Sequence, residues 1–174
     1  FQSLGSDAAV MVKSIAGGGG RGMRPVTDLA DLEDVMTRCQ SEAEATFGDG
    51  SVYVEQLIKA ARHVEIQVAA DQDGNVVVFG DRDCSLQRRR QKIIEVAPAP
   101  GLSTEQRDTL WSHAATLTKA ANYTCLGTVE FLLGGDGAIA FIEFNARLQV
   151  EHTVTEAVTG LDLVRMQFDI GNGA

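Results

Sequence analysis

The sequence predicts a mixed fold of the α+β class, and three features support this. Short stretches rich in Val and Ile, such as residues 51–58 and 63–70, have the composition of strands. Two longer stretches, 27–48 and 103–121, repeat apolar residues at helical spacing. These strands and helices do not alternate as a regular βαβ series, so a doubly wound parallel sheet is not expected.

The first third of the chain predicts a strand, a glycine-rich loop, a helix and a second strand. Residues 7–16 form an apolar run, and GGGGRG follows at 17–22. The helix is expected from Thr27 or Asp28, either of which can serve as its N-cap. Its buried stripe is Leu29, Leu32, Val35, Met36 and Cys39. Residues 51–58 complete this part as a strand.

The middle third predicts strands around a tight turn and then a second helix. The strand at 63–70 is followed by the turn sequence DQDGN and by the apolar run NVVVFGD. The sequence STEQ at 103–106 has the form of a capping box, in which the first and fourth side chains cap the helix reciprocally. The helix that follows should bury Leu110, Ala114, Leu117 and Ala121.

The last third contains a predicted hairpin that brings two carboxylates together. Asp136-Gly137 is typical of a two-residue type I′ turn, which pairs Gly135 with Ala138 and sets Glu130 opposite Glu143. Like charges at facing positions are destabilising unless a cation lies between them. The alternative is a register slip that separates the two glutamates.

Residues 141–156, FIEFNARLQVEHTVTE, alternate apolar with polar residues. The polar positions are Glu143, Asn145, Arg147, Gln149 and Glu151. Such alternation also occurs in any half-buried surface strand. A strand face this rich in carboxylates, amides and a guanidinium instead favours binding of something charged. TVTE at 153–156 has the capping-box form and should start a last helix that carries Val158, Leu161 and Val164.

The overall composition excludes several classes of function. A formal charge of −9 argues against general nucleic-acid binding, which needs a basic face. The basic cluster QRRRQK (87–92) is therefore expected to have a local role within this chain. No apolar run approaches the ~20 residues of a membrane span. Cys39, Cys84 and Cys125 lack the spacing of a disulfide framework or a zinc site, so we expect a cytoplasmic protein. Because the chain begins at Phe1 in a short polar stretch, we expect it to be part of a longer protein.

The glycine-rich run indicates phosphate binding without matching a standard nucleotide motif. It contains GxGxxG, but Pro25 follows where a Rossmann turn needs a helix, and Met23 and Arg24 replace the Lys-Ser/Thr of a Walker A loop. The run is therefore either a mobile linker or a loop whose backbone N–H groups close over phosphates. Lys13, on the strand before it, either extends to solvent or reaches a phosphate oxygen.

Together these features predict an ATP-dependent phosphoryl transfer to a small anion. Carboxylates with the amide oxygen of Asn145 are hard ligands that suit Mg²⁺ or Mn²⁺ completed by water and nucleotide phosphates. The row from Arg147 to Glu151 lies just beyond them and would face the anion. The residues alone do not identify the acceptor.

Several motifs in order then resemble one family. MVKSIAGGGGRGMR, HVEIQV, DRDCSLQRRRQKIIEVAPAPG, GTVEFL and FIEFNARLQVEHTVTE closely resemble the biotin carboxylase component of biotin-dependent carboxylases, over residues 8–171. The resemblance implies an ATP-grasp fold, with residues 1–56 as the smaller lobe with its glycine lid and 57–174 as part of the larger lobe. It implies that ATP phosphorylates bicarbonate to carboxyphosphate and that the carbon then passes to biotin.

The resemblance also assigns roles by position. It assigns ATP binding to Lys13, Gly17, Gly18, Gly19, Gly20, Gly22, Glu55, Gln56, Leu57, His63, Gln87, Arg90 and Leu132. It assigns the metals to Glu130, Glu143 and Asn145, and bicarbonate to Lys92, Arg147, Gln149, Val150 and Glu151. Among these it implies that Glu151, Arg147 and Lys92 are catalytic, with Glu151 as the base. Gln56, Arg90 and Thr153 depart from many members, which have Lys, His and Pro there.

The implied partners lie outside this chain. They are biotin on a carrier protein or domain and a carboxyltransferase, within a parent enzyme that is expected to be a homo-oligomer. The family's further ATP lysine and its biotin-side arginine are absent from these residues, so we expect the chain alone to bind MgATP without turnover. Two alternatives stay open: a ligase like carbamoyl phosphate synthetase, and a nucleotide-binding module that no longer turns over.

Overall fold

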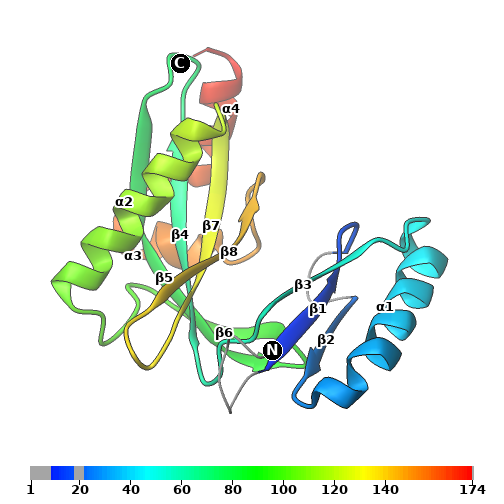
Figure 1. Cartoon of the computed structure of the whole chain (residues 1–174). Coiled ribbons are helices and arrows are strands. Elements are labelled where there is room, and N and C mark those ends of the chain that lie inside the picture. The colour runs from blue at the N-terminus through cyan, green and yellow to red at the C-terminus, as the bar shows by residue number, and fades with distance from the viewer. Residues whose placement is uncertain (1–8, 18–21, 174) are drawn as a thin grey trace. The chain divides into compact units, whose positions relative to one another are not determined.

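A computed structural model describes residues 9–17 and 22–173 of the chain. The chain divides into two compact units. The small unit comprises Phe1–Lys59 with Arg88–Gln91, and the large unit comprises Ala60–Gln87 with Lys92–Ala174 (Figure 1). The lobe boundary expected after residue 56 stays a prediction about the longer protein.

The small unit is a three-stranded antiparallel sheet with one helix packed on it. In order across the sheet, its strands are β2 (Met23–Val26), β1 (Val10–Ser14) and β3 (Val52–Gln56). Helix α1 (Leu32–Phe47) follows a 3₁₀ turn at Leu29–Asp31. The core includes Val10, Val12, Val26 and Cys39. Of the two N-cap candidates, the Asp28 carboxylate accepts a hydrogen bond from Ala30 N at 3.0 Å and caps the 3₁₀ turn.

The large unit is a five-stranded antiparallel sheet with helices on both faces (Figure 1). Its strands, in order across the sheet, are β6 (Gln91–Val96), β5 (Val76–Arg88), β4 (Arg62–Ala70), β7 (Cys125–Leu133) and β8 (Ile139–Asn145). Its helices are α2 (Thr104–Ala120), α3 (His152–Thr159) and α4 (Leu163–Gly171). This mixture of antiparallel sheets and helices confirms the α+β class.

The two faces of the central strands differ sharply in polarity. On the face under α2, alternate residues of β4 and β7 form the main core with two residues of the helix: Val64, Ile66, Val68, Val129, Phe131, Leu110 and Ala114. Because side chains alternate along a strand, the residues between them point the other way. These residues are Glu65 and Gln67 on β4 and Thr128 and Glu130 on β7, all buried. The sheet thus has an apolar face under α2, whereas the opposite face is polar along these four residues and apolar beyond them, where Ala69 and Leu126 pack with Leu163 and Ile170 of α4.

The predicted capping box is present at the start of α2. Ser103 Oγ accepts a hydrogen bond from Gln106 N at 3.1 Å, and Gln106 Oε1 accepts one from Ser103 N at 3.0 Å. Two N–H groups that the helix leaves unpaired are satisfied in this way.

The predicted last helix differs from the observed one. Helix α3 begins at His152 with Glu151 as its N-cap residue, so Thr153 lies inside the helix and caps nothing. It ends at Thr159, and the C-cap residue Gly160 has a φ of 73°, which glycine readily adopts. Asp162 then caps a separate helix, α4, by accepting a hydrogen bond from Arg165 N at 2.8 Å. The single helix expected through Leu161 and Val164 is therefore two.

The β7–β8 hairpin reaches the predicted pairing by a different route. The turn has three residues, because Gly134 N donates to Ala138 O at 2.8 Å and Gly137 adopts a φ of 84°. That turn alone would shift the register by one residue from the predicted two-residue turn. A bulge between Glu130 and Phe131 shifts it back, so Glu130 does lie opposite Glu143. The predicted turn was wrong and the predicted pair is confirmed.

A second hairpin, β5–β6, was not predicted. Its turn residues Arg89 and Arg90 have φ values of 51° and 66°. Positive φ at both central positions is the geometry of a type I′ turn, which usually carries Asn or Gly. The cluster QRRRQK therefore forms a hairpin tip, and Lys92 lies on the strand that returns from it.

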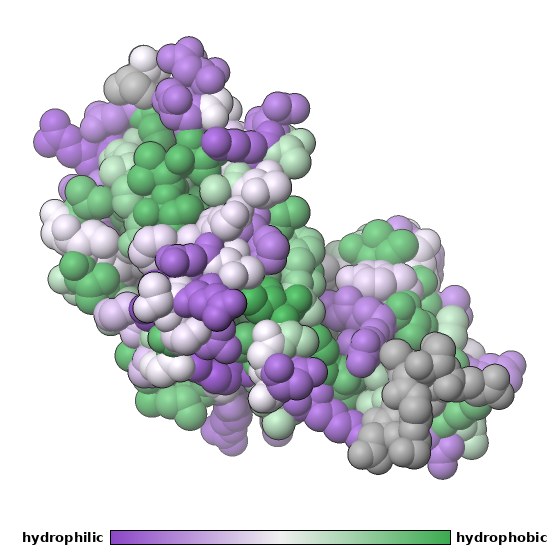
Figure 2. All heavy atoms as spheres, turned by 60° about the vertical axis from the view of Figure 1, so that its left-hand side comes forward, coloured by the Kyte–Doolittle hydropathy of each residue, from purple (hydrophilic) through white to green (hydrophobic). Residues whose placement is uncertain are grey.

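The described part of the chain has no helix that is long and apolar enough to span a membrane. Figure 2 shows hydrophobic side chains gathered in patches between polar ones on its visible face. Exposed apolar residues of this kind occur on both α4 (Phe168) and β6 (Ile93, Ile94). Scattered apolar exposure is ordinary for a folded protein surface.

Candidate active site

A row of three glutamates crosses the polar face of the large sheet. Glu65 on β4 lies opposite Glu130 on β7, which in turn lies opposite Glu143 on β8. Glu65 and Glu130 are 0% and 3% exposed. Facing carboxylates at such burial repel each other strongly unless positive charge or hydrogen-bond donors reach them. The neighbouring side chains supply both.

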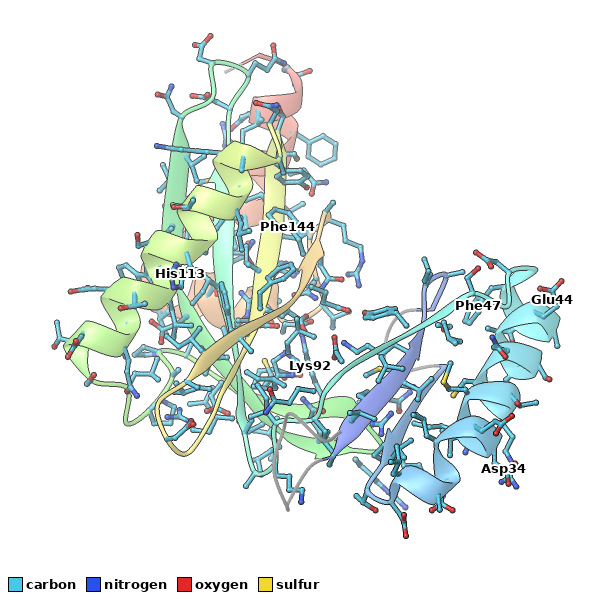
Figure 3. All side chains as sticks on the ribbon, viewed as in Figure 1. Asp34, Glu44, Phe47, Lys92, His113 and Phe144 are labelled. Carbon is cyan, nitrogen blue, oxygen red and sulfur yellow. The ribbon has the colours of Figure 1, made fainter. Side chains whose placement is uncertain are left out.

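Lys92 is the main source of positive charge. Its Nζ lies 2.5 Å from Glu65 Oε2, 2.8 Å from Glu130 Oε1 and 2.6 Å from Glu151 Oε1. Lys92 can be found on β6 in Figure 3. An ammonium has three N–H donors, and each faces a different carboxylate. One lysine therefore joins β4, β7 and the start of α3.

These contacts shift the protonation of the cluster. Burial opposes the charge on Lys92, but the carboxylates of Glu65 and Glu130 outweigh it and raise the pKa of Lys92. Burial alone would raise the pKa of Glu130; the hydrogen bond from His63 and the charge of Lys92 instead lower it to about 2. The pKa of Glu151 is likewise lowered, because the hydrogen bond from Lys92 outweighs burial. At neutral pH a charged Lys92 therefore lies between the ionised carboxylates of Glu130 and Glu151.

The tautomer of His63 follows from its neighbours. Gln87 Nε2 lies 2.8 Å from Cys84 O and 2.7 Å from His63 Nδ1. A carbonyl oxygen only accepts, so the atom facing it is the amide N–H₂, and Nδ1 must accept from the same group. The proton of a neutral His63 is then on Nε2, which donates to Glu130 Oε2 at 2.6 Å. His63 thus fixes the second oxygen of Glu130.

The glutamate pair of the hairpin fits a hard divalent cation. Asn145 Nδ2 donates to Glu130 Oε1 at 3.0 Å and to Glu143 Oε1 at 2.9 Å, so one amide group bridges both carboxylates. The nitrogen and oxygen of an amide exchange places by rotation about one bond, which would turn the oxygen toward the same point. Two carboxylates and an amide oxygen form a donor set that suits Mg²⁺ or Mn²⁺.

Another group of potential metal ligands is less suitable. Ligand atoms of His63, Glu65 and Glu130 lie within 4.8 Å of one another. However, Glu65 is bound on one oxygen by Arg82 and on the other by Lys92. Two cations already neutralise this carboxylate and would repel a third. The chemistry of the donors therefore favours Glu130, Glu143 and Asn145.

The predicted row of alternating polar residues is not a single strand. Strand β8 ends at Asn145, and Arg147 to Glu151 lie in the loop before α3. The loop still returns two of them to the cluster: Glu151 to Lys92, and Gln149 Nε2 to Glu130 Oε1 at 3.1 Å. Gln149 is 6% exposed, and its Oε1 has no hydrogen-bond partner among the described residues.

The other two loop residues are open to solvent. Val150 is 89% exposed. The Arg147 guanidinium bonds within its own loop, to Leu148 O at 3.3 Å and Asn145 Oδ1 at 3.4 Å. Both contacts are long, so they leave the guanidinium available to an anion. The polar residues therefore gather at one site without lying on one strand.

The nucleotide residues expected on β1 and β3 of the small unit lie along one strand pair. Lys13 is 7% exposed, and its Nζ lies 2.5 Å from Glu55 Oε1 and 5.9 Å from the centre of the Tyr53 ring. Gln56 ends β3, and the backbone of Leu57 continues the pairing by donating to Ala9 O at 2.9 Å. Lys13 thus forms an ion pair along the sheet and does not extend into solvent.

The glycine run is described at its two ends. Gly17 and Gly22 flank Gly18, Gly19 and Gly20, which lie outside the described residues. Gly22 has a φ of 70°, and a Cβ there would lie 2.2 Å from Ser14 Oγ. This position requires glycine for both reasons. Nearby, Arg90 Nη1 donates to Met23 O at 2.7 Å, which ties the β5–β6 turn to β2 within the small unit.

The remaining assigned nucleotide residues belong to the large unit. Leu132 lies on β7 directly opposite His63, and Gln87 contacts His63. The structure therefore brings His63, Gln87 and Leu132 together, whereas Lys13, Glu55, Gln56, Leu57 and Arg90 belong to the small unit.

The sequence analysis missed Glu65 and the residues that hold it. Arg82 on β5 is fully buried and bonds Glu65, Gln67, Thr128 and Thr155. A signal was present, because the alternation in HVEIQV places a carboxylate and an amide on one face of a buried strand. Arg82 gave no signal by its spacing, since its partners are scattered along the chain.

Comparisons with known proteins agree on one family. The sequence profile of the carbamoyl-phosphate synthase L chain ATP-binding domain matches residues 6–174. Pyruvate carboxylase of Aspergillus terreus is 49% identical over 165 residues, which are 95% of this chain and 14% of that protein.

Two solved structures match nearly the whole chain. The biotin carboxylase β,γ-ATP complex of Campylobacter jejuni has a TM-score of 0.95 at 44% identity over 99% of this chain and 38% of its own. The biotin carboxylase domain of Hydrogenobacter thermophilus 2-oxoglutarate carboxylase, in complex with MgADP, ADP and bicarbonate, has a TM-score of 0.93 at 41% identity, with the same coverages. The chain thus spans well under half of each of these relatives.

Proposed function

Since this chain belongs to the family of the carbamoyl-phosphate synthase L chain ATP-binding domain, and within it to the biotin carboxylases, we propose that its parent protein carboxylates biotin on a carrier with ATP and bicarbonate. The observation that carries the proposal is the Lys92 junction. It joins the base candidate Glu151 to Glu130, which the Asn145 amide bridges to Glu143. Metal donors and a base thus share one cluster.

We assign nucleotide binding to residues of each unit. Lys13 supplies a point charge for a phosphate oxygen, and the glycine run supplies backbone N–H groups. Glu55, Gln56 and Leu57 lie at the end of β3, where the resemblance places the adenine. His63 and Gln87 accompany Leu132 in the large unit, and Arg90 holds the hairpin tip.

The metal ligands in this proposal are Glu130, Glu143 and Asn145, with Mg²⁺ as the first choice and Mn²⁺ as the alternative. When bound, the cation supplies charge neutralisation between nucleotide phosphates and substrate. The Hydrogenobacter thermophilus domain was solved in complex with MgADP, which supports magnesium for that relative. His63 and Lys92 keep Glu130 ionised and oriented for this role.

Bicarbonate is assigned to the loop before α3. Arg147 offers an exposed guanidinium, and Gln149 lies beside Glu130 with the carbonyl end of its amide unpaired among the described residues. The exposed Val150 leaves its backbone open to an anion. Lys92, held in its charged form, acts as a fixed cation because its protonated amine cannot accept a proton.

Glu151 is the base in this scheme. Glu151 is ionised at neutral pH, so its carboxylate can accept the proton of bicarbonate and leave a nucleophilic oxygen; the lowered pKa secures the ionised form and makes Glu151 a weaker base. That oxygen attacks the γ-phosphoryl group of ATP to form carboxyphosphate, and ADP leaves. The carbon then passes to a nitrogen of biotin as phosphate is released, and the released phosphate takes the proton that this nitrogen loses. Lys92 stabilises the negative charge that Glu151 and the anion bring together.

The proposal extends to partners outside the chain: a biotin carrier protein or domain, a carboxyltransferase, and a homo-oligomeric parent enzyme of the cytoplasm. The names of the relatives differ in their acceptors, one being a pyruvate carboxylase and another a 2-oxoglutarate carboxylase. The proposal is therefore limited to the carboxylation of biotin.

The test uses the full-length protein and its Glu151→Gln variant. We expect bicarbonate- and biotin-dependent ATP hydrolysis to fall by ~10²–10⁴-fold, the usual effect of losing a general base, with ATP affinity nearly unchanged. Glu105→Gln, which changes an exposed glutamate in the first turn of α2, is the matched control and should keep full activity. ATP hydrolysis that ignores biotin but requires ammonia would instead support a carbamoyl phosphate synthetase-like ligase.

A further inference from the structure

Arg82 is a buried charge that binds four side chains at once. It is fully buried, and its Nε donates to Glu65 while Nη1 donates to Gln67 Oε1 at 2.8 Å and to Thr155 Oγ1 at 2.7 Å. Nη2 makes a longer contact of 3.3 Å with Thr128 Oγ1. Burying a guanidinium is costly, and alternatives such as a hydrophobic residue often stabilise a fold better. In return, the buried guanidinium of Arg82 fixes the orientation of the side chains that it binds.

One arm of Arg82 leads to Lys92. The Glu65 carboxylate uses one oxygen for Arg82 and the other for Lys92, at 2.5 Å. Glu65 is therefore held in one orientation, and its second oxygen fixes one of the three donors of the Lys92 amine. Gln67 assists by accepting from Arg82 while its Nε2 donates to Gly127 O at 2.9 Å, which sets the orientation of its amide.

The other arm of Arg82 leads to Glu151. Thr155 lies four residues after Glu151, so it is one turn into the helix whose N-cap residue is Glu151. The bond from Arg82 to Thr155 ties this first turn of α3 to the sheet. The Glu151 side chain makes no capping bond to α3 and instead accepts from Lys92, so the bonds from Lys92 to Glu151 and from Arg82 to Thr155 both hold this turn to the sheet.

We propose that Arg82 is a positioning residue that holds Lys92, through Glu65, and Glu151, through Thr155, in register for proton transfer from bicarbonate. The inference rests on the proposed function for the chemistry and on the contacts above for the placement. Arg82 makes no hydrogen bond to Lys92 or Glu151 and acts through Glu65 and Thr155. The planar guanidinium has several N–H groups pointing in different directions, which allows one side chain to bind both. A lysine carries all its N–H donors on one nitrogen, so at this position it would not reproduce the separate donors, Nε and Nη1, that reach Glu65 and Thr155.

Kinetics of the full-length protein test the chemical part. Thr155→Val replaces a hydroxyl by a methyl group of similar shape and should lower kcat by ~10-fold, as small displacements of reacting groups do, with KM for ATP unchanged. Thr155→Ser restores the acceptor and should restore kcat. Thr118→Val is the matched control, because Thr118 is a buried helical threonine whose hydroxyl, among the described residues, bonds only Ala114 O of its own helix. It should leave kcat unchanged.

A double-mutant cycle tests whether Arg82 is the link. In the Arg82→Lys background, Thr155→Val should cause little further loss of kcat, because the bond between them is already broken. Additive losses would overturn the proposal. It would also be overturned by wild-type kcat in Thr155→Val, or by equal losses in Thr155→Ser and Thr155→Val.

Hydrogen–deuterium exchange of the same proteins without substrates tests the placement independently. Thr155→Val should speed exchange of the amides at 153–156, whereas Thr118→Val should not. If the unaltered protein lacks bicarbonate-dependent ATP hydrolysis, the proposed function fails, while this exchange still decides whether Arg82 holds the first turn of α3. Unchanged exchange at 153–156 in Thr155→Val would overturn the placement.

Discussion

The low pKa of Glu130 predicts how the stability of the chain depends on pH. Its pKa falls from the ordinary 4.5 to about 2 in the folded chain. At about 1.4 kcal/mol for each tenfold change in proton affinity, this difference corresponds to about 3 kcal/mol of stability. Because the folded pKa is the lower one, this contribution is present above pH 4.5 and is lost as the pH falls through about 2.

The window for the measurement follows from these two values. By about pH 3, some 2 of the 3 kcal/mol should be gone, because the unfolded chain then binds a proton that the folded chain still excludes. Urea unfolding of the 174-residue chain in metal-free buffer at about pH 6 and pH 3 gives the difference directly. Glu130→Gln cannot bind that proton, so its stability should fall by about 2 kcal/mol less over the same interval.

A matched control separates Glu130 from general acid effects. Glu105→Gln alters an exposed carboxylate that makes no side-chain ion pair in the part of the chain that the structure describes, and should follow the unaltered chain. If Glu130→Gln loses as much stability as the unaltered chain, to within about 0.5 kcal/mol, then Lys92 and His63 do not stabilise the Glu130 carboxylate as argued.

Three further predictions concern other parts of the chain. Glu143→Gln should weaken MgATP binding in calorimetric titration without unfolding the chain, because a carboxylate ligand becomes an amide; equal affinities would remove the metal assignment. Cys84 should react with iodoacetamide far more slowly than the partly exposed Cys125, since burial raises the pKa of Cys84; mass spectrometry of labelled peptides would show the order, and equal rates would contradict it. Arg89→Asn should stabilise the chain by ~0.5 kcal/mol in urea unfolding, because Asn tolerates the φ of 51° better; a loss of stability would mean that the arginine side chain itself supports the turn.

Local patterns predicted the elements whose residues are neighbours in sequence. The capping box at Ser103 and most of the apolar stripe of α1 are visible because a helix places residues three and four apart on one side. The predicted burial was wrong at the helix ends, where Leu29 is 51% exposed in the 3₁₀ turn and Ala121 is the exposed C-cap residue of α2. The strand at 63–70 is visible for a similar reason. The role of Glu65 on that strand was not predicted, because its partners, Arg82 and Lys92, lie on β5 and β6.

Features that depend on distant residues were predicted poorly. The turn at Arg89 and Arg90 has no Asn or Gly, and its backbone is held in part by the bond from Arg90 to Met23, which is 67 residues away. Similarly, alternation from Glu143 to Glu151 predicted a continuous strand, but the chain leaves the sheet after Asn145 and folds back to Lys92. The polar residues were identified and their geometry was not, since tertiary contacts override local propensity.

The bulge in the β7–β8 hairpin separates the ladder into two segments that face different surroundings. Phe141 lies opposite Phe131, on the apolar side under α2, while Glu143, only two residues later, lies opposite Glu130 on the polar side. In a regular strand these two side chains would share a face. Ile142 absorbs the difference as the extra residue of the bulge. The acidic segment therefore keeps its register against β7 although the hairpin tip alternates with the opposite phase, so the bulge isolates the Glu130–Glu143 pair from the length of the turn.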